Sequence, residues 1–599
     1  MIYAYLFEAK SVQAYILDSG RLRDLVGASE QVDQLCGDLD GKLDERMLLD
    51  QVVKAAGLVA LDPFDGIDDQ RIGERIVFSR KAGGAFFAFS GSADSIDRLA
   101  LLWPLAVRQF APGLDFDQGR GVGATALAAF DAARGETVDV DTPAGHDLRS
   151  ARSRPLVQLP EAGPLVHRSQ RTGRPAVDLE ASPEGALELV DATTIRQRRF
   201  RNPTEPSRRR GTLIERFRPP ELQLTWDNWP IDLEPGDTTA FPFIDDNRTV
   251  AVVHADGNGI GQLLQKLLQH ISDHAQARFI ELLSLFSTEL DRITREAVQS
   301  AVREVLWPNR DANDILPARP IVLGGDDLTL IVRGDLALAF TACFLRAFEH
   351  ASLGLIAKLK KTRRADNQTT DLALPFDRLT ACAGIAYIKA GQPFYLANRL
   401  AEGIAGAVKQ RAKAMVADTP QRMPASSLGF HRITTAVIDD YPRILERELS
   451  TSGTSPDQPR RWRHTLGAYA VGDGAAALPQ LRDLIELQRL LEEPAMARGP
   501  ARELLTLLGQ SEAEARVRYQ RWRRVLGDGQ PDAGREFDER LSTLLATPSQ
   551  DLALPYRQAM TADDSAATTP TREGPLADLH ALLSVRSRTD LFGNEEPQQ

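Results

Sequence analysis

The stretch PIVLGGDDLTLIV, residues 320–332, decides the fold of the domain around it. An apolar run leads into Gly324 and Gly325, then into Asp326 and Asp327, and a second apolar run follows. Two apolar runs joined by a short glycine turn predict a β-hairpin, because glycine adopts the backbone angles that tight turns need. We expect this hairpin to hold both carboxylates at a fixed edge of a sheet.

A second stretch, VAVVHADGNGIG at residues 250–261, carries a further carboxylate. Its apolar strand ends at Asp256, and the turn that leads into the next helix contains Gly257, Asn258, Gly259 and Gly261. In a split βαβ, ferredoxin-like sheet, the first strand lies beside the central hairpin. Asp256 is therefore predicted to approach Asp326 and Asp327.

Three converging carboxylates point to divalent metal ions. Such groups repel one another and lose hydration on burial, and oxygen-preferring ions such as Mg²⁺ relieve both effects. The glycine-rich turn at a helix start offers backbone N–H groups to a triphosphate. Each stretch also has an ordinary interpretation, as a solvated hairpin turn or a capped helix start. Their joint occurrence on one predicted sheet favours the metal site.

The segments around these motifs repeat one order of elements. The apolar pattern predicts strands at 250–255, 320–323, 328–332 and 379–388, and helices at 261–268, 275–302, 337–348 and 393–414. The N-terminal segment predicts strands at 2–7, 75–79 and 85–90, helices at 11–25 and 95–110, and a closing strand and helix within 111–135. We therefore expect an α+β protein with two ferredoxin-like, palm-like domains.

A chain of 599 residues corresponds to roughly three to five domains. Beyond residue 430 no strand pair is predicted, and leucines at helix-face spacing indicate a helical domain. The expected division is a first palm at 1–135, an irregular basic linker or insert at 136–240, a catalytic palm at 241–426, a helical domain at 427–560 and a largely flexible tail at 561–599. Residues 576–585 are the exception within this tail, where we expect order.

The composition, with 43% hydrophobic and 26% charged residues, is globular. No apolar run approaches the ~20 residues of a membrane span, and the N-terminus lacks the layout of a signal peptide, so we expect a cytoplasmic protein without membrane contact. The three cysteines, Cys36, Cys343 and Cys382, are too widely spaced for a paired zinc site. A net charge of -11 gives no general attraction for nucleic acid.

A basic run stands out against this acidic background. Residues 196–218 contain nine arginines and two acidic residues, Glu205 and Glu215. The run is either a solvated linker or a contact surface for RNA or partner subunits, and its two phenylalanines support a base-stacking platform only weakly. Self-association of the chain is a further option for partners.

These motifs resemble a known family. The strand-ADGNGIG-helix, the strand-GGDD-strand and residues 379–413 look like the catalytic palm of the large polymerase/cyclase subunit of type III CRISPR effector complexes, and more distantly like GGDEF diguanylate cyclases and class III nucleotidyl cyclases. Residues 5–30 resemble the first palm of that subunit, and residues 427–436 with 464–471 resemble its C-terminal region. The resemblance covers most of residues 1–555 and is sharpest in the second palm.

The resemblance implies synthesis of cyclic oligoadenylates from ATP with two Mg²⁺ or Mn²⁺ ions, in antiviral defence. Asp256, Asp326 and Asp327 would hold the metals, with the Gly257 carbonyl as a further ligand. The glycines of both turns, Gly324 and Gly325 included, and Asn258 would face the nucleotide. Lys409, where the family usually has a lysine, would neutralise triphosphate charge, although a plain surface lysine is the competing interpretation.

The chain departs from the family pattern in several places. Asn258 stands where the family has a second acidic residue. The sequence shows no HD nuclease ahead of the first palm, and the one His-Asp pair, His146-Asp147, lies in the irregular segment; that segment has no cysteine for the family's zinc element. The first palm's hairpin, SRKAGGAF, has no carboxylate pair; Lys81 would meet acceptor phosphates there or serve a structural role.

Two other functions stay open. A cyclase that uses GTP is the enzyme alternative, which the leucine after GGDD and the missing guanine-contact pattern disfavour mildly. A scaffold that binds RNA or partner subunits through residues 196–218, with silent acids, is the non-enzyme alternative. The intact set of acidic residues favours the enzyme.

Overall fold

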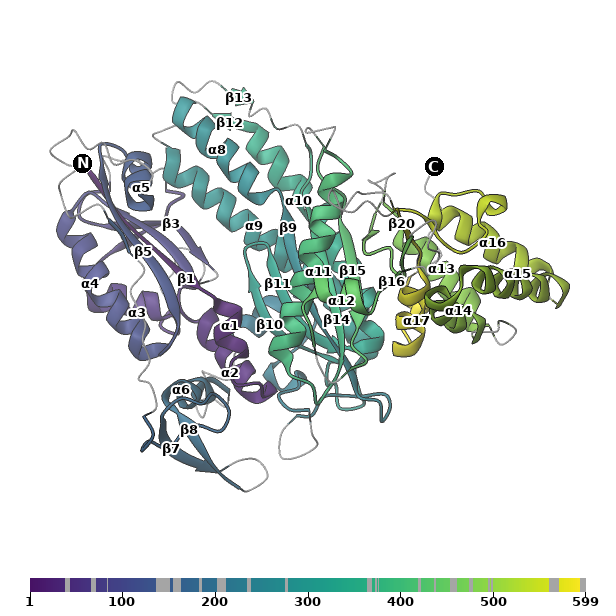
Figure 1. Cartoon of the computed structure of the whole chain (residues 1–599). Helices are drawn as coiled ribbons and strands as arrows, with labels where there is room; N and C mark the ends of the chain where they lie inside the picture. The colour runs from purple at the N-terminus through teal and green to yellow at the C-terminus, as the bar shows by residue number, and fades with distance from the viewer. Residues whose placement is uncertain are drawn as a thin grey trace.

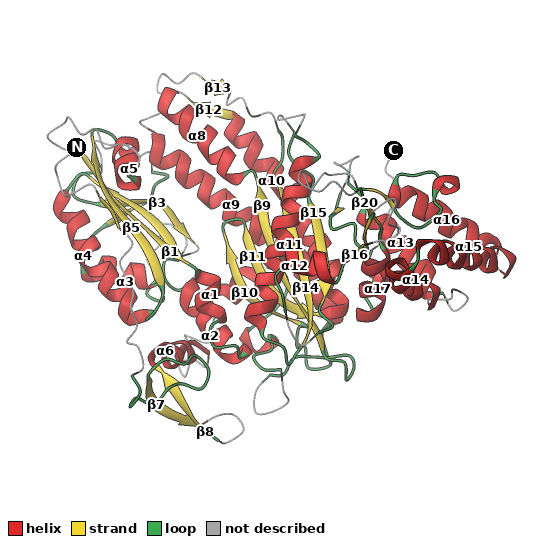
Figure 2. Ribbon diagram, viewed as in Figure 1, coloured by secondary structure: helices red, strands yellow, loops and turns green. Residues whose placement is uncertain are grey.

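The structure is a computed structural model of the 599-residue chain. It describes residues 1–37, 44–65, 72–82, 84–135, 151–153, 163–181, 186–201, 212–233, 239–274, 278–363, 369–371, 374, 376–417, 422–435, 438–452, 460–472, 478–493, 496, 499–529, 531–559 and 570–592. The protein is a mixed α+β structure in which two six-stranded sheets lie side by side and a largely helical region follows (Figures 1 and 2).

The first sheet has the strand order β2-β3-β4-β1-β5-β6. Its strands are β1 (Ile2–Lys10), β2 (Ala60–Leu61), β3 (Ile76–Ala82), β4 (Ala85–Ser90), β5 (Asp115–Gly123) and β6 (Ala151–Ser153). Its helices are α1 (Val12–Leu17), α2 (Leu22–Asp33), α3 (Leu48–Ala55), α4 (Ala93–Phe110) and α5 (Ala126–Arg134). The closing strand and helix predicted within 111–135 are confirmed as β5 and α5.

The second sheet has the strand order β10-β11-β9-β14-β15-β18. Its strands are β9 (Thr249–Asn258), β10 (Ala318–Gly324), β11 (Asp327–Arg333), β14 (Thr380–Lys389), β15 (Ser427–Arg432) and β18 (Tyr469–Ala470). Its helices are α8 (Ile260–His274), α9 (Phe279–Ala301), α10 (Ala337–Lys360) and α11 (Phe394–Ala414), with the short turns η4 (Val302–Leu306), η5 (Trp307–Asn309) and η6 (Gly334–Leu336) and the ribbon β12 (Lys361–Arg363) and β13 (Thr369–Asp371).

Both sheets place a hairpin beside the first strand and the closing strand on its other side. The four central strands are β3-β4-β1-β5 in one sheet and β10-β11-β9-β14 in the other, and both closing strands run antiparallel to the first strand. This is the order of a split βαβ unit. It sets the GGDD hairpin of β10 and β11 next to β9, as the sequence predicts.

Alternating side chains of β9 pack on two helical layers. Ala251 and Val253 face the core that includes α9 and α10, whereas Val250 and Val252 face the core that includes α11. Helix α11 lies close to the sheet because β14 carries Gly384, where a Cβ would come within 2.0 Å of a backbone oxygen of the helix. This close packing positions the side chains of α11 over the end of β9.

Helix α9 joins the two sheets. It contacts β3 of the first sheet and α10 of the second, and it lies between the sheets in Figure 1. Its Phe279 ring packs 5.8 Å from Phe89 and 5.3 Å from Phe130, centroid to centroid. Aromatic pairs at such distances add to the burial of apolar surface.

One helical segment, residues 334–360, is long and apolar enough to cross a membrane by length and composition alone. Sequence analysis found no such run, and in this the prediction was wrong. In the structure, 67% of its most apolar window is buried inside the protein. Its apolar character therefore matches its place in the core beside α9.

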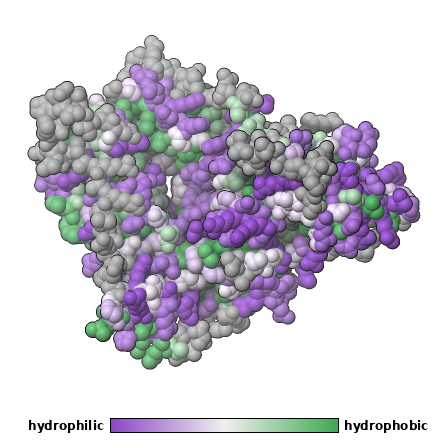
Figure 3. Space-filling model, in the orientation of Figure 1, coloured by the Kyte–Doolittle hydropathy of each residue, from purple (hydrophilic) through white to green (hydrophobic). Residues whose placement is uncertain are grey.

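The segment at 136–240 is less irregular than predicted. It contains the hairpin β7 (Ala176–Ala181) and β8 (Leu187–Asp191), the helices α6 (Ala192–Arg201) and α7 (Thr212–Phe217), and the turn η2 (Trp226–Asn228). Apolar side chains are exposed at this hairpin, and Figure 3 shows an apolar patch there. His146-Asp147 lies outside the described residues.

Some arginines of the basic run 196–218 form ion pairs within the protein. Arg198 binds Asp24 of the first domain at 2.9 Å, and also contacts Glu180 and Glu188. The prediction of a solvated or phosphate-contacting surface is therefore wrong for this arginine, because its charge is neutralised within the protein. Residues 202–211 of the run lie outside the described part of the chain.

The C-terminal region also differs from its prediction. Residues 427–432 form β15 of the second sheet, so the predicted boundary after residue 426 cuts that sheet. A further sheet has the order β16-β17-β20-β19, which the sequence did not predict because its strands are short. These strands are β16 (Ser450–Ser452), β17 (Arg461–Arg463), β19 (Arg557–Gln558) and β20 (Thr571–Glu573).

Helices make up most of the remaining C-terminal region, as predicted. They are α12 (Tyr441–Arg447), α13 (Leu481–Glu492), α14 (Gly499–Gln510), α15 (Glu512–Gly529), α16 (Pro531–Leu545) and α17 (Leu576–Val585), with η7 (Ser549–Asp551) and η8 (Thr589–Leu591). Leu579 and Leu582 of α17 are buried, so the segment 576–585, which the sequence excepts from the flexible tail, belongs to the packed protein.

Candidate functional site

The GGDD turn forms the tip of the hairpin between β10 and β11. Gly324 pairs with Asp327 across the hairpin, and Gly325 has a φ of 61°. Residues with a side chain rarely adopt this left-handed conformation, which explains the need for glycine at that position. The turn sets Asp326 and Asp327 at the edge of the second sheet.

The end of β9 lies beside this turn. Leu328 of β11 pairs with Ala255 of β9, and Asp256 follows one residue further along. Asp326 packs directly against Gly257, where an added Cβ would lie 2.9 Å from both the Cβ and the Oδ2 of Asp326. The structure therefore brings together the three predicted carboxylates, and only glycine at 257 leaves room for Asp326.

Lys409 reaches the same corner from α11. Its Nζ donates a short hydrogen bond to Asp256 Oδ2 and a second one, of 2.7 Å, to the Gly257 carbonyl oxygen. Lys409 is therefore no plain surface lysine. It contacts two of the four groups that the resemblance assigns to the metal ions.

Three further polar residues complete the corner, and sequence analysis missed them. His254 Nδ1 lies 3.3 Å from Asp327 Oδ1 and 3.3 Å from Thr329 Oγ1. Gln13 of α1 donates to Asp327 Oδ2 at 3.0 Å. Strand alternation could have indicated His254 and Thr329, since they lie two residues from Asp256 and Asp327. No local signal identifies Gln13, which comes from the first domain.

The hairpin is held from behind by buried polar side chains. Arg216 of α7 donates to the Leu323 carbonyl at 2.7 Å and binds Asp33 at 3.0 Å. Thr294 of α9 donates to the Gly325 carbonyl, and Ser29 of α2 donates to the Ile321 carbonyl. Three different helices thus fix the backbone of the carboxylate-bearing turn.

The crowded carboxylates have perturbed acidity. Burial, together with the nearby negative charge of Asp256, raises the pKa of Asp326 to about 7. Burial and the same charge raise the pKa of Asp327 to about 7. Burial lowers the pKa of His254. A partly buried group of like charges is typical of sites that bind a cation or perform chemistry.

The residues of the glycine-rich turn at the end of β9 differ in how closely other atoms surround them. Gly259 has a φ of 73°, and a Cβ there would lie 2.7 Å from Met423 Cε. A Cβ at Gly261 would have no atom within 4 Å. The Asn258 side chain is buried and donates to Thr380 Oγ1 at 3.0 Å and to Cys382 Sγ at 3.2 Å. The Asn258 side chain therefore links β9 to β14. Because the side chain is engaged in this way, only the backbone of Asn258 could make the predicted contact with a nucleotide.

The donor set fits a divalent cation by its chemistry. Carboxylate and carbonyl oxygens are the ligands that Mg²⁺ prefers, and Asp327 Oδ1 is buried without a hydrogen-bond donor. Among the described residues, however, no group of three or more His, Cys, Asp and Glu side chains is placed to hold an ion. Two of the oxygens that the resemblance assigns to a metal ion, Asp256 Oδ2 and the Gly257 carbonyl oxygen, accept hydrogen bonds from Lys409.

The first sheet offers a counterpart of this corner without its carboxylate pair. Ala85 stands where the second sheet has Asp327, and it pairs with Glu8, which takes the place of Asp256. Lys10 neutralises Glu8 at 2.5 Å. Of the two roles open for Lys81, the structure supports the structural one, because Lys81 is buried in a 2.7 Å ion pair with Asp50.

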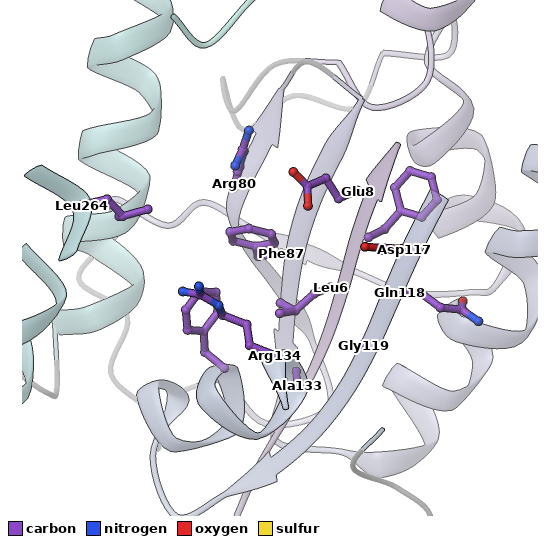
Figure 4. A pocket seen from close by; sticks show the side chains of 12 residues that line it. Leu6, Glu8, Arg80, Phe87, Asp117, Gln118, Gly119, Ala133, Arg134 and Leu264 are labelled. Carbon is purple, nitrogen blue, oxygen red and sulfur yellow. The ribbon is translucent and has the colours of Figure 1, made fainter. Parts of the chain in front are cut away.

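A cavity of about 220 Å³ lies over this counterpart corner (Figure 4). Arg80 stacks 5.5 Å from the centre of the Phe87 ring, and Leu264 of α8 points into the cavity from the second domain. Glu8 and Asp117 supply negative charge at its rim. The cavity therefore combines apolar walls with both signs of charge.

Comparison with solved structures finds Csm1-Csm4 cassettes. The cassette in complex with cA4 has a TM-score of 0.38 and 12% identity, covering 98% of this chain and 69% of that one. The cassette with AMPPNP has a TM-score of 0.33 and 12% identity, and the Csm1-Csm4 subcomplex of the type III-A CRISPR-Csm interference complex has 0.32 and 13%; both alignments cover 68% of this chain and 53% of theirs. No family model and no curated protein matches the chain. At these values no residue role follows from the likeness.

Proposed function

We propose that the second-sheet domain is a palm of the nucleotidyl cyclase type, which makes cyclic oligoadenylates from ATP in a cytoplasmic, type III CRISPR-like defence. The observation that carries the proposal is the convergence of Asp256 with Asp326 and Asp327 at one sheet edge. The reaction joins a ribose 3′-hydroxyl to the α-phosphate of a second ATP and releases pyrophosphate.

The three carboxylates would hold two Mg²⁺ or Mn²⁺ ions, with the Gly257 carbonyl as an additional ligand. When bound, such ions lower the pKa of the attacking hydroxyl and stabilise the departing pyrophosphate. Asp326 and Asp327 gain fixed positions from the hairpin, which Arg216 and Thr294 hold from behind. This rigidity favours reaction because little reorganisation is left for the chemical step.

The turn after β9 would bind the triphosphate. Helix α8 begins four residues after Asp256, and a Cβ at Gly261 would have no atom within 4 Å, so side chains do not block the backbone N–H groups at that helix start. Lys409, whose ammonium already lies at this corner, can neutralise phosphate charge. The Gly324–Gly325 turn supports the same space from the hairpin side.

The test is product analysis. The purified chain is incubated with ATP or GTP and Mn²⁺, and the products are identified by mass spectrometry. We expect cyclic oligoadenylates from ATP, no product from GTP, and at least a 100-fold loss in the Asp326→Ala, Asp327→Ala double variant, because one lost transition-state contact costs about that much. A product from GTP alone would identify the competing cyclase, and an unchanged double variant would refute the proposal.

Partner contacts are proposed for the basic run 196–218 with effector subunits or RNA. Arg198 and Arg216 bind carboxylates within the protein, so contact with phosphate would have to come from the other arginines of the run. If the acids were silent and the chain only a scaffold, the aspartate variants would bind partners normally and the wild type would make no product.

A further inference from the structure

We propose that Lys409 is a resident counter-ion of the catalytic corner, which occupies metal-ligand oxygens until a divalent ion displaces it. The inference rests on the proposed function, because it assumes that Asp256 and the Gly257 carbonyl bind metal. It assigns Lys409 a role before the nucleotide arrives, in addition to any contact with phosphate afterwards.

The geometry supports direct competition. The Lys409 ammonium donates to Asp256 Oδ2 and, at 2.7 Å, to the Gly257 carbonyl oxygen. An ammonium and a divalent ion at these two oxygens would overlap, since both need the same lone pairs.

The backbone of Lys409 is fixed by the surrounding helix, whereas its side chain is partly exposed. Two residues further along α11, Arg411 forms a buried pair with Glu573, at 2.7 and 2.6 Å, which fixes this end of the helix. The Lys409 side chain is 23% exposed, and that of Asp256 is 41% exposed. A long flexible side chain on a fixed helix can leave Asp256 without any change of fold.

Displacement would also deliver positive charge where the nucleotide needs it. The ion that replaces the ammonium neutralises Asp256 more strongly, because it carries two charges. The released ammonium stays beside the glycine-rich turn, within reach of a triphosphate. Lys409 therefore lowers metal affinity in the resting protein and favours binding of metal together with nucleotide.

The experiment measures Mn²⁺ binding without nucleotide, by isothermal titration calorimetry on the full chain. We expect Lys409→Met to bind Mn²⁺ about tenfold more tightly than the wild type, since one competing charge contact is removed. Lys413→Met is the matched control, because Lys413 lies one turn further along the same helix and its side chain is exposed. Lys409→Arg, which keeps the charge, should bind as weakly as the wild type.

A second readout confirms that the variant is folded and that Asp256 has lost its counter-ion. Without divalent ions, Lys409→Met should have a lower Tm than the wild type, and saturating Mn²⁺ should raise its Tm more than that of the wild type. Equal or weaker Mn²⁺ binding by Lys409→Met, with binding still abolished by Asp326→Ala, would overturn the counter-ion role and leave the proposed function standing. Absence of Mn²⁺ binding in every variant would overturn both.

Discussion

Among single residues, the aspartates of the hairpin show the conflict between stability and function. Asp326 and Asp327 lie partly buried beside Asp256, and this raises their pKa to about 7. Folding therefore favours their protonated forms, and their negative charge destabilises the metal-free protein. A corner that binds a cation well is for the same reason unfavourable without one.

Asp326→Asn should stabilise the metal-free protein. Removing one of the crowded charges should raise the Tm by roughly 1 to 3 °C at pH 8. The pKa of Asp326 rises from 3.8 to about 7 on folding. Protonated Asp326 therefore contributes its full share to the free energy of unfolding below pH 4, and this contribution is lost as the pH rises through 7. The Tm difference between variant and wild type should therefore vanish at low pH. Differential scanning fluorimetry with EDTA, from pH 4 to 8, measures the Tm difference; a constant difference would contradict the explanation.

Among the secondary-structure elements, the hairpin depends on helices that the sequence places far away. Strand β10 is an edge strand, and its carbonyl oxygens are bound by Ser29 of α2 and by Arg216 of α7. Arg216 also binds Asp33 and Asp291, which are buried to a similar degree. Arg216 thus donates a hydrogen bond to a carbonyl oxygen of β10 on the side where an edge strand has no neighbouring strand.

Arg216→Ala should destabilise both the protein and the metal site. Removing one partner of a buried ion pair leaves carboxylates unpaired, which costs about 3 kcal/mol, and the GGDD turn loses its support. Urea unfolding should show the loss of stability, and calorimetry with Mn²⁺ should show weaker binding. Arg443→Ala is the control, since Arg443 on α12 is 65% exposed. A destabilised Arg216 variant with unchanged Mn²⁺ affinity would restrict Arg216 to a role in stability.

For the chain as a whole, the two domains meet at the candidate site around Asp327. Gln13 of α1 belongs to the first domain, yet its amide donates to Asp327 Oδ2 at 3.0 Å and lies 3.5 Å from Thr329 Oγ1. Helix α9 joins the same two sheets through Phe279. The first domain therefore contributes a polar contact to the site although its own hairpin has no carboxylate pair.

Gln13→Ala should lower product formation about tenfold, because a hydrogen bond to a charged group is lost. The Tm should change by less than that of Arg216→Ala, since Gln13 is only partly buried. Rates from ATP and Mn²⁺, measured by chromatography, test this. Gln51→Ala is a suitable control, because Gln51 on α3 makes one exposed hydrogen bond to a backbone oxygen. An unchanged rate would show that the first domain does not position Asp327.

The amino-acid pattern was sufficient for the local features: the hairpin at 320–332, the strand that ends near Asp256, and the repeated order of strands and helices. Hydrophobic periodicity and glycine chemistry act over a few residues, so they are legible along the chain. Strands of two or three residues, such as β16 and β19, carry too little periodicity to be recognised.

Tertiary packing alone decided which distant groups meet. It placed Gln13 on Asp327, Arg216 behind the hairpin, and Lys81 in a buried pair with Asp50 instead of at a phosphate. It also placed the Lys409 ammonium on oxygens that the sequence assigns to a metal ion. Such contacts join residues tens to hundreds of positions apart, and the free energy that selects them comes from burial and charge pairing in the folded state.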